Sequence, residues 1–411
     1  MENLRFGAFL APHHPIGEHP MLMIERDLKL AELLDDLGFD EFWCGEHHST
    51  GWETIASPEM FLAGAAQRTQ RIKLGTGVSS LPYHHPFMVA QRITQLDLMS
   101  RGRAILGTGP GALPSDAHAM GIDPMTQRDR QGEAISVIKP LLAGERVTHH
   151  ADWFTMNDAA LQILPLQKEL EIATASMVSP SGMTLAGKYG LGVLSIGSMS
   201  TAGIQSLPLQ WSFAEDAAAI SGANIDRSQW RVMFNFHIAE TREEAREQSK
   251  LGLQRWHNEY TVGTLLRQGA TAYDTPDQAV DELAFSEGSS AVIGTPDDLV
   301  DRIAEMYEVT GGFGAVIGFA NDWANIENQR RSWDLVARYV IPKVQGLMKP
   351  QLRSQRHVVE HRDAFDRAGK AVLSKIMEND KAAAALKDGA AAAAPIASPN
   401  APNLDEAAVK S

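Results

Sequence analysis

Three consecutive ionisable residues, Glu46-His47-His48, follow a short apolar segment. Their side chains could transfer protons in a reaction. Histidine is the side chain that exchanges protons near neutral pH without a large pKa shift. If the apolar segment is a parallel barrel strand, its carboxyl end places His47 at the mouth of a site. A structural histidine held by a neighbouring loop is the alternative. We take His47 as the catalytic candidate and expect Glu46 to hold loop backbone or a neighbouring arginine.

Two further pairs of adjacent histidines, His13-His14 and His84-His85, raise the question of a metal site. Hydrolytic metal centres on barrels usually take His-x-His from one strand, because alternate residues of a strand face the same side. Adjacent histidines point to opposite sides, so we expect no metal. Pro86 directly follows the second pair and suits the first position of a helix, which makes a turn and a helix cap the simpler interpretation.

Glycines end two other apolar segments, at Gly75-Thr76-Gly77 and Gly107-Thr108-Gly109. Glycine lets a flat ligand approach the backbone and permits dihedral angles that other residues avoid. Neither segment is the dinucleotide fingerprint Gly-x-Gly-x-x-Gly, because a proline follows the second one and removes an N–H group where a phosphate needs it. A tight turn is the plain alternative at both places.

A helix is expected to begin near Pro180, with Ser179 as its N-cap and Pro180 in its first position. The free N–H groups and the positive dipole end of such a helix start also bind phosphate. Arg128 and Arg130 could supply a cationic fork for the same phosphate. Helix capping alone, and solvated pairing of the arginines with neighbouring carboxylates, are the alternatives.

Short apolar runs that alternate with helix-periodic segments must position these residues. The expected strands are Leu4–Leu10, Phe39–Gly45, Ile72–Gly77, Ala104–Thr108, Leu170–Ala175, Gly192–Ile196, Val232–Ala239 and Ala315–Phe319. The helical segments between them include Met21–Leu37, Pro58–Thr69, Pro86–Met99, Gln127–Leu142 and Thr295–Thr310. Eight strands, each followed by helical sequence, predict an α/β fold of the (β/α)₈ TIM-barrel type. An open, doubly wound sheet is the rival.

Two insertions interrupt this alternation. The segment 144–167 is polar and contains proline, and Glu259–Ser290 is a long excursion that contains Gly, Thr, Asp and Pro. Long loops in a compact domain are usually functional lids or disordered, and we expect the second to be a lid.

The composition changes after the barrel, so we expect a domain over 1–350 and a tail over 351–411. Within the tail, Ser354–Lys387 is expected to be one exposed or partner-packing helix. The segment Gly389–Ser411 is rich in Ala, Pro and Asn and is expected to be disordered.

Composition also limits the partners and the compartment. The 411 residues are 44% apolar and carry a formal net charge of -14, which argues against nucleic acid or an anionic membrane as partner. A few placed arginines can still hold an anionic cofactor. Cys44 is the single cysteine, so no intrachain disulfide can form. With no signal peptide and no apolar stretch long enough for a membrane, we expect a cytoplasmic protein.

Several motifs, in their order and spacing, resemble the bacterial-luciferase-like family of flavin-dependent monooxygenases from Leu4 to about Val344. They are Gly38–Trp43 leading to Glu46-His47-His48, Gly75–Pro82, His85-Pro86, Leu96–Arg103, Ala186–Gly190 and Val292–Asp297. The segment Ser176–Met183 is most similar to the limonene-type terpene monooxygenases of that family.

The resemblance implies that His47 takes the role of the family's catalytic histidine. It also implies a non-prolyl cis peptide at Gly77–Val78 beneath the flavin ring, and a phosphate site at Arg128 and near Ser179. The implied cofactor-binding residues are Gly77, Val78, Thr108, Gly109, Arg128, Ser176, Ser179, Pro180, Ser181 and Gly182. The luciferases proper have a reactive Cys and an Arg where this sequence has Gly109 and Pro110, which argues against light emission.

The function that the resemblance implies is oxygenation with O2 and reduced FMN, a dissociable cosubstrate delivered by a separate NAD(P)H:flavin reductase. It also implies a homodimer through helices of the first half. Phe9, Met177 and Phe319 at strand ends favour a small apolar substrate, although each also suits barrel core. A deazaflavin-dependent dehydrogenase or reductase on the same barrel is the enzymatic alternative, and a non-catalytic flavin-binding protein is the other.

Overall fold

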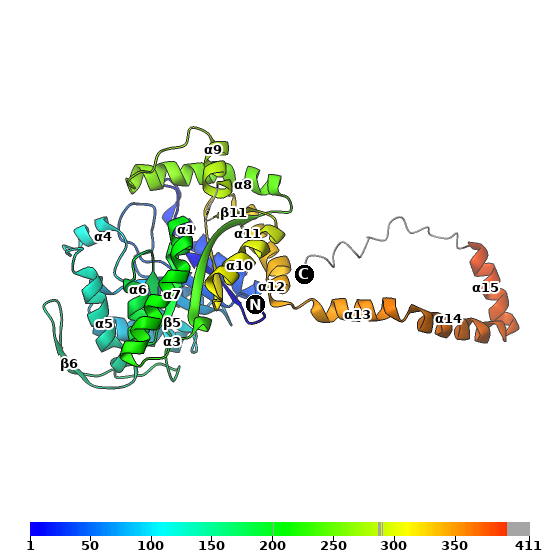
Figure 1. Cartoon of the computed structure of the whole chain (residues 1–411), viewed down its shortest axis with the longest axis horizontal. Coiled ribbons are helices and arrows are strands. Elements are labelled where there is room, and N and C mark those ends of the chain that lie inside the picture. Colours follow the sequence, from blue (N-terminus) through cyan, green and yellow to red (C-terminus); the bar gives the residue numbers. More distant parts are fainter. Residues whose placement is uncertain (200, 287–288, 290, 393–411) are drawn as a thin grey trace. The chain divides into compact units, whose positions relative to one another are not determined.

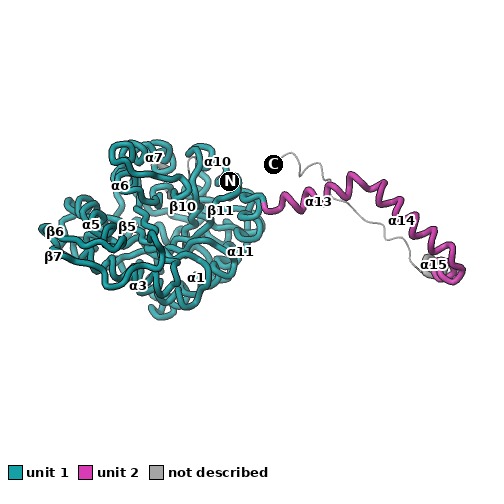
Figure 2. Tube along the Cα trace, turned by 90° about the horizontal axis from the view of Figure 1, so that it is seen from below, with its two compact units in different colours: residues 1–346 teal, residues 347–411 magenta. Residues whose placement is uncertain are grey.

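The computed structural model describes residues 1–199, 201–286, 289 and 291–392. It divides the chain into two compact units, Met1–Gly346 and Leu347–Ser411 (Figure 2). The first unit holds every residue that the sequence singles out for chemistry.

Within the described residues of the first unit, eight parallel strands close into a barrel (Figure 1). In barrel order they are β1 (Arg5–Leu10), β2 (Glu41–Cys44), β3 (Lys73–Thr76), β5 (Ala104–Gly109), β8 (Ile172–Ser176), β9 (Gly192–Ser195), β10 (Trp230–Ile238) and β12 (Ala315–Phe319). Pairing of Arg5 with Ala315 joins the last strand to the first. The predicted barrel is confirmed, and the closed order excludes the open doubly wound sheet.

Two short strands lie beside this barrel and were not predicted. β4 (Ser79–Ser80) pairs with the end of β5, and β11 (Ala291–Gly294) pairs with the carboxyl half of β10. Each adds a short extension to one barrel strand at the end where the candidate site lies.

Helices follow the barrel strands. They are α1 (Pro20–Leu37), α2 (Pro58–Ala66), α3 (Pro86–Met99), α4 (Pro114–Ala119), α5 (Gln127–Leu142), α6 (Ser181–Tyr189), α7 (Thr201–Ser221), α8 (Arg242–Arg255), α10 (Pro296–Thr310), α11 (Ile326–Leu335) and α12 (Ile341–Gln345). The start of α3 follows the prediction: Pro86 is its first residue, and the His85 ring accepts the Phe87 N–H. His85 is therefore a helix cap.

The two insertions both have regular structure. The first forms a hairpin of β6 (Val147–His150) and β7 (Thr155–Ala159). The second begins inside a π-helix, η4 (Trp256–Thr264), which continues α8, and goes on to α9 (Pro276–Val280) and a short π-helix, η5 (Asp281–Phe285). The excursion is therefore largely helical, and its residues 287, 288 and 290 lie outside the described residues.

The described part of the tail, up to residue 392, contains three helices, so the prediction of one helix is wrong. They are α13 (Lys349–Glu360), α14 (Arg362–Met377) and α15 (Asp380–Ala392). The break before α15 has a local cause, since the side chain of Asn379 accepts the Ala382 N–H and caps the new helix. The expected disorder falls mostly on residues 393–411, outside the described residues, while 389–392 belong to α15. Of the helices described in both units, none is long and apolar enough to cross a membrane.

The glycines of β3 and β5 are explained by the barrel interior. Trp43 is fully buried there, and a Cβ on Gly75 would lie 2.5 Å from its indole. A Cβ on Gly107 would lie 1.9 Å from the Thr76 carbonyl oxygen and 2.9 Å from the same indole. These two glycines make room for Trp43, so the segment Gly107–Gly109 is strand and the alternative of a tight turn is wrong there.

Candidate active site

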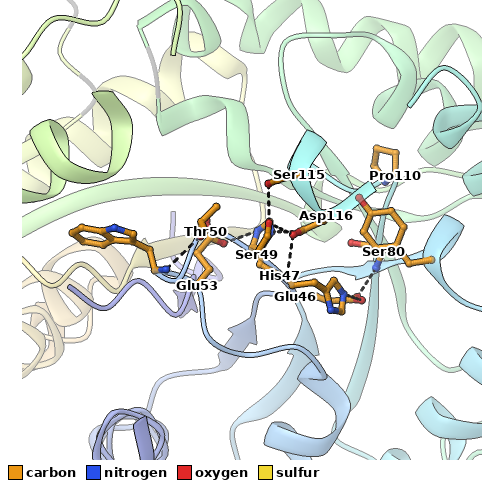
Figure 3. Close-up of polar contacts among 12 residues, drawn as sticks. Glu46, His47, Ser49, Thr50, Glu53, Ser80, Pro110, Ser115 and Asp116 are labelled. Atoms are coloured by element: carbon orange, nitrogen blue, oxygen red, sulfur yellow. Dashed lines mark hydrogen bonds and ion pairs between the residues drawn. The ribbon is translucent and has the colours of Figure 1, made fainter. Parts of the chain in front are cut away.

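His47 lies at the carboxyl end of β2, between two carboxylates (Figure 3). Its Nδ1 is 3.0 Å from Asp116 Oδ2, and its Nε2 is 2.6 Å from Glu53 Oε2. Glu53 belongs to the loop after β2, and Asp116 lies in the first turn of α4. The Nδ1 contact is a hydrogen bond and the Nε2 contact is an ion pair, so the two carboxylates favour the imidazolium over the neutral ring.

The charge of His47 follows from these partners. Burial alone would lower its pKa, but the hydrogen bonds to Asp116 and Glu53 raise the pKa of His47 to about 9. The side chain is therefore mainly protonated at neutral pH. It is suited to donate a proton or to hold a positive charge, and poorly suited to act as a neutral base.

Asp116 also organises the backbone next to His47. Its Oδ1 accepts the His48 N–H at 3.1 Å and the hydroxyl of Ser49. Burial opposes ionisation, yet the hydrogen bonds from His47 and Ser49 keep the pKa of Asp116 below its ordinary value. This carboxylate thus fixes both the ring of His47 and the turn that follows it.

Glu46 forms a second carboxylate centre. Its Oε1 lies 2.9 Å from His48 Nε2 and 2.6 Å from His84 Nε2, and its Oε2 accepts the Ser80 N–H at 2.7 Å. Burial opposes ionisation, but these contacts lower the pKa of Glu46 to about 2. Glu46 holds loop backbone as predicted, with histidines in place of an arginine, and links the segments after β2 and β3.

Three residues that sequence reasoning missed complete the site: Glu53, Asp116 and Tyr260. The Tyr260 hydroxyl donates to Glu53 Oε1, and His13 Nε2 lies 3.1 Å from the same oxygen. Glu53 follows His47 by six residues and could have been noticed as a nearby acid. Asp116 and Tyr260 are far from His47 in the sequence, and only the fold brings them there.

The predicted ring-binding residues Gly77, Val78 and Gly109 lie together. The Gly77–Val78 peptide is cis, at the place that the sequence resemblance indicates. A Cβ on Gly109 would lie 2.4 Å from a methyl of Val78, so this glycine allows the two segments to touch. Thr108 is fully buried and its hydroxyl donates to the Ala173 carbonyl, so its side chain serves the sheet.

The predicted phosphate residues fall into two groups. Ser176 is buried and donates to Gln210, and Gly182 is buried where a Cβ would lie 2.2 Å from the Ala175 carbonyl oxygen. Both therefore have packing roles. Ser179 and Ser181 lie at the start of α6 and bond to each other at 2.8 Å.

The predicted cap of α6 is wrong by one residue. Pro180 is the N-cap and Ser181 the first helical residue, and Ser179 makes no capping bond. The N–H groups of the first turn of α6 have no partner within the helix, which leaves them available to an anion.

Arg128 lies in the first turn of α5, is exposed, and makes no hydrogen bond or ion pair with any residue the structure describes. Arg130 does not form a fork with it, because it pairs with Asp152 at 3.2 Å. Both helices follow parallel barrel strands, so both begin at the carboxyl end of the barrel, and they pack together one to two turns further on, where a Cβ on Gly132 would be 3.3 Å from Leu185. Arg128 is thus a cation at this end that has no partner among the described residues.

Across the described residues there is no group of three or more His, Cys, Asp or Glu side chains that could hold a metal ion. His85 caps α3, and the other histidines named above contact carboxylates, as His14 does with Asp27 at 2.9 Å.

Comparison with known proteins indicates the family to which the chain belongs. The family model described as luciferase-like monooxygenase matches residues 4–312. The 4-hydroxyprotoasukamycin monooxygenase of Streptomyces nodosus subsp. asukaensis is 47% identical over 88% of this chain and 97% of its own length. Limonene 1,2-monooxygenase of Rhodococcus erythropolis is 46% identical over 88% of this chain and 92% of its own.

A solved structure supports the same assignment. It is the oxygenating constituent of 3,6-diketocamphane monooxygenase from Pseudomonas putida, a type II Baeyer-Villiger monooxygenase in complex with FMN. It has a TM-score of 0.70 and 25% identity, and the match covers 83% of this chain and 99% of that one. Together with the barrel and the family match, these relatives show that the chain belongs to the luciferase-like monooxygenase family.

Proposed function

We propose that the protein is the oxygenase of a two-component monooxygenase system in the cytoplasm. It takes reduced FMN from a separate NAD(P)H:flavin reductase and uses O2 to oxygenate a small apolar, terpene-like substrate. The observation that carries this proposal is the protonated His47 between Glu53 and Asp116 at the mouth of the barrel. Monooxygenase relatives of nearly the same length support the reaction class.

The residues at the mouth suit FMN. Exposed Arg128, the hydroxyls of Ser179 and Ser181 and the N–H groups at the start of α6 would hold the phosphate. The cis segment Gly77–Val78 would support the ring system. When bound, reduced FMN supplies the two electrons that, with O2, place one oxygen atom in the substrate and reduce the other to water.

His47 is the proton donor of this proposal. The carboxylates of Glu53 and Asp116 hold protons on its Nε2 and Nδ1 at neutral pH. A positioned acid of this kind can protonate an oxygen atom that gains negative charge at the mouth. Both ring nitrogens already face a carboxylate, so this transfer requires one of the two contacts to open.

An apolar substrate is favoured by aromatic side chains at the strand ends. Phe9 and Phe319 stack with their ring centroids 5.7 Å apart, and Phe319 also lies against His13 at 5.7 Å. Met177 follows β8 directly and is half exposed. Apolar surface of this kind binds terpene-like hydrocarbons through burial and excludes water from the reacting atoms.

The proposed homodimer is supported by exposed apolar side chains on adjacent helices of the first half. Met21 and Leu22 of α1 are 63% and 58% exposed, and Met60 of α2 is 76% exposed. Met88 and Met99 of α3 are also exposed. Such an apolar face on a protein of net charge -14 is suited to contact with a second copy of the chain.

The test of this function is an oxygen balance. Chemically reduced FMN, the protein and a panel of small alkenes and ketones that includes limonene are mixed with ¹⁸O2, and products are analysed by mass spectrometry. We expect one ¹⁸O atom per product molecule and one O2 consumed per product formed. Substrate oxidation without oxygen uptake, with electrons passed to a deazaflavin, would show a dehydrogenase instead.

A further inference from the structure

Tyr260 of the helical excursion contacts the candidate site directly. α8 begins with a capping box of Thr241 and Glu244 and continues without a break into η4. Tyr260 lies in the middle of η4 and is only 4% exposed. Its hydroxyl donates to Glu53 Oε1, and the other oxygen of that carboxylate faces His47. A single carboxylate therefore links the excursion to the catalytic candidate.

The position of Tyr260 is set by packing on both sides. Its ring lies 4.6 Å from the ring of His13 and 5.5 Å from that of Trp52, which is buried. His13 also contacts Glu53 Oε1 at 3.1 Å. The carboxylate of Glu53 thus has contacts with Tyr260 and His13 on one oxygen and with His47 on the other.

The excursion itself is held by internal bonds that place η4 over the mouth. Asn258 donates to the Tyr273 carbonyl and accepts the Tyr273 N–H, both at 2.9 Å. His257 Nε2 contacts the Thr271 carbonyl at 3.0 Å. At Gly252, a Cβ would lie 2.2 Å from the Trp323 carbonyl oxygen, so α8 lies directly on the segment after β12. These bonds and the packing of α8 fix the position of Tyr260.

The protonation states around Glu53 are compatible with this link. Burial and the nearby Glu53 raise the pKa of Tyr260, so the phenol stays a neutral donor. Burial opposes ionisation of Glu53, but His13 and His47 keep the pKa of Glu53 below its ordinary value. The bond is therefore a charge-assisted hydrogen bond from a neutral hydroxyl to a carboxylate, which is stronger than a neutral one.

We propose that Tyr260 is a positioning residue that acts on His47 through Glu53. Packing of the excursion on the barrel thereby sets the orientation and charge of the catalytic histidine. Donation by Tyr260 fixes the rotamer of Glu53 and takes up part of its negative charge. The negative charge that remains on Glu53 and the position of its Oε2 atom determine the strength of the ion pair with His47 Nε2. The role of His47 in oxygenation rests on the proposed function, whereas the link from Tyr260 to His47 does not.

The test is an NMR titration of the histidine rings in the protein without flavin or substrate. The variant Tyr260→Phe removes only the hydroxyl, and Tyr273→Phe is the matched control in the same excursion. No hydrogen bond joins the Tyr273 hydroxyl to any described residue, and its backbone bonds to Asn258 survive the change. The His47 signals are assigned by their loss in His47→Gln.

We expect Tyr260→Phe to raise the His47 titration midpoint by about 0.5 pH unit or more, because a carboxylate without the phenol donor attracts the imidazolium more strongly. Tyr273→Phe is expected to leave the midpoint at the wild-type value. In a Glu53→Gln background, Tyr260→Phe is expected to have no further effect, since the two changes act through one contact. A wild-type midpoint in Tyr260→Phe would overturn the proposal.

Incorporation of 3-fluorotyrosine at position 260 tests the opposite direction and keeps the shape of the side chain. Its more acidic phenol is a stronger donor, so the His47 midpoint is expected to fall below that of the wild type. An unchanged or raised midpoint would contradict the proposal even if Tyr260→Phe fails to fold. Because neither titration requires oxygenation, a failure of the proposed function would appear separately in the ¹⁸O2 experiment.

Discussion

At the scale of single residues, the mouth of the barrel is organised by carboxylates that hold histidines. Glu46 contacts His48 and His84, while Glu53 contacts His13 and His47. The adjacent histidines of the pairs His13-His14 and His47-His48 are thus separated onto different acidic partners. The pairing of His47 with two carboxylates gives it a charge that an isolated histidine would lack at neutral pH.

The charge of His47 leads to a pH-dependent stability. Its folded-state pKa of about 9 lies above the ordinary value, so its stabilisation is complete below pH about 6.5 and is lost as the pH rises through about 9. We predict that the unfolding free energy of the wild type relative to His47→Gln falls by roughly 3 kcal/mol between pH 6 and pH 10. Urea denaturation of both proteins at several pH values measures this difference. A difference that stays constant with pH would contradict the ion-pair assignment.

At the scale of elements, the first turns of α5 and α6 form the proposed phosphate site. Arg128 is exposed and lies at the same end as the start of α6. We predict that Arg128→Gln weakens binding of reduced FMN by about 1.5–3 kcal/mol and leaves riboflavin binding unchanged, because only FMN carries the phosphate.

Arg130→Gln is the control for this prediction, since Arg130 is already paired with Asp152 and its loss should affect FMN much less. Anaerobic titration of each variant with both flavins gives the four dissociation constants that are needed. If Arg128→Gln weakened riboflavin and FMN equally, the phosphate would bind elsewhere.

Sequence patterns predicted the regular elements of the barrel well, because strands and helices there follow local periodicity. The limits of α3 and α5 agree with the prediction at both ends. The excursion was expected to be a loop because of its Gly, Thr and Pro content, yet η4 is helical, since packing of Tyr260 and Trp256 at the mouth stabilises it. Tertiary contacts of this kind are invisible to local propensity.

At the scale of the whole molecule, barrel closure creates both the core and the site. Arg231 of β10 is fully buried and bonds to Glu41 of β2 at 2.6 Å, across the barrel interior, beneath the ring of Trp43. Closure likewise brings Glu53, Asp116 and Tyr260 together around His47. Glu53 lies six residues after His47, but no spacing in the sequence indicates Asp116 or Tyr260, because both are far along the chain and only the folded barrel brings them to the site.

The close packing around the interior glycines predicts how Gly→Ala substitutions change the unfolding free energy. Gly107→Ala would place a Cβ 1.9 Å from the Thr76 carbonyl oxygen, so we predict a loss of about 3 kcal/mol of unfolding free energy. Gly64→Ala in α2 is the control, because its Cβ would meet only Leu28 at 3.6 Å, and it should stabilise by about 0.5–1 kcal/mol. Thermal unfolding of the two variants should shift the midpoint in opposite directions, and a stabilising Gly107→Ala would contradict the packing described here.

Single-turnover oxidation shows whether His47 takes part in oxygenation by reduced FMN. Reduced FMN bound to the wild type, His47→Ala or His48→Ala is mixed with O2 and substrate, and the product is quantified. We predict that His47→Ala keeps the fold and the flavin but forms product roughly 10²–10⁴-fold more slowly, the usual effect of losing a positioned acid–base group. His48→Ala should do less, because its ring is held by Glu46 instead of Glu53. Product formation by His47→Ala at the wild-type rate would exclude a catalytic role for His47.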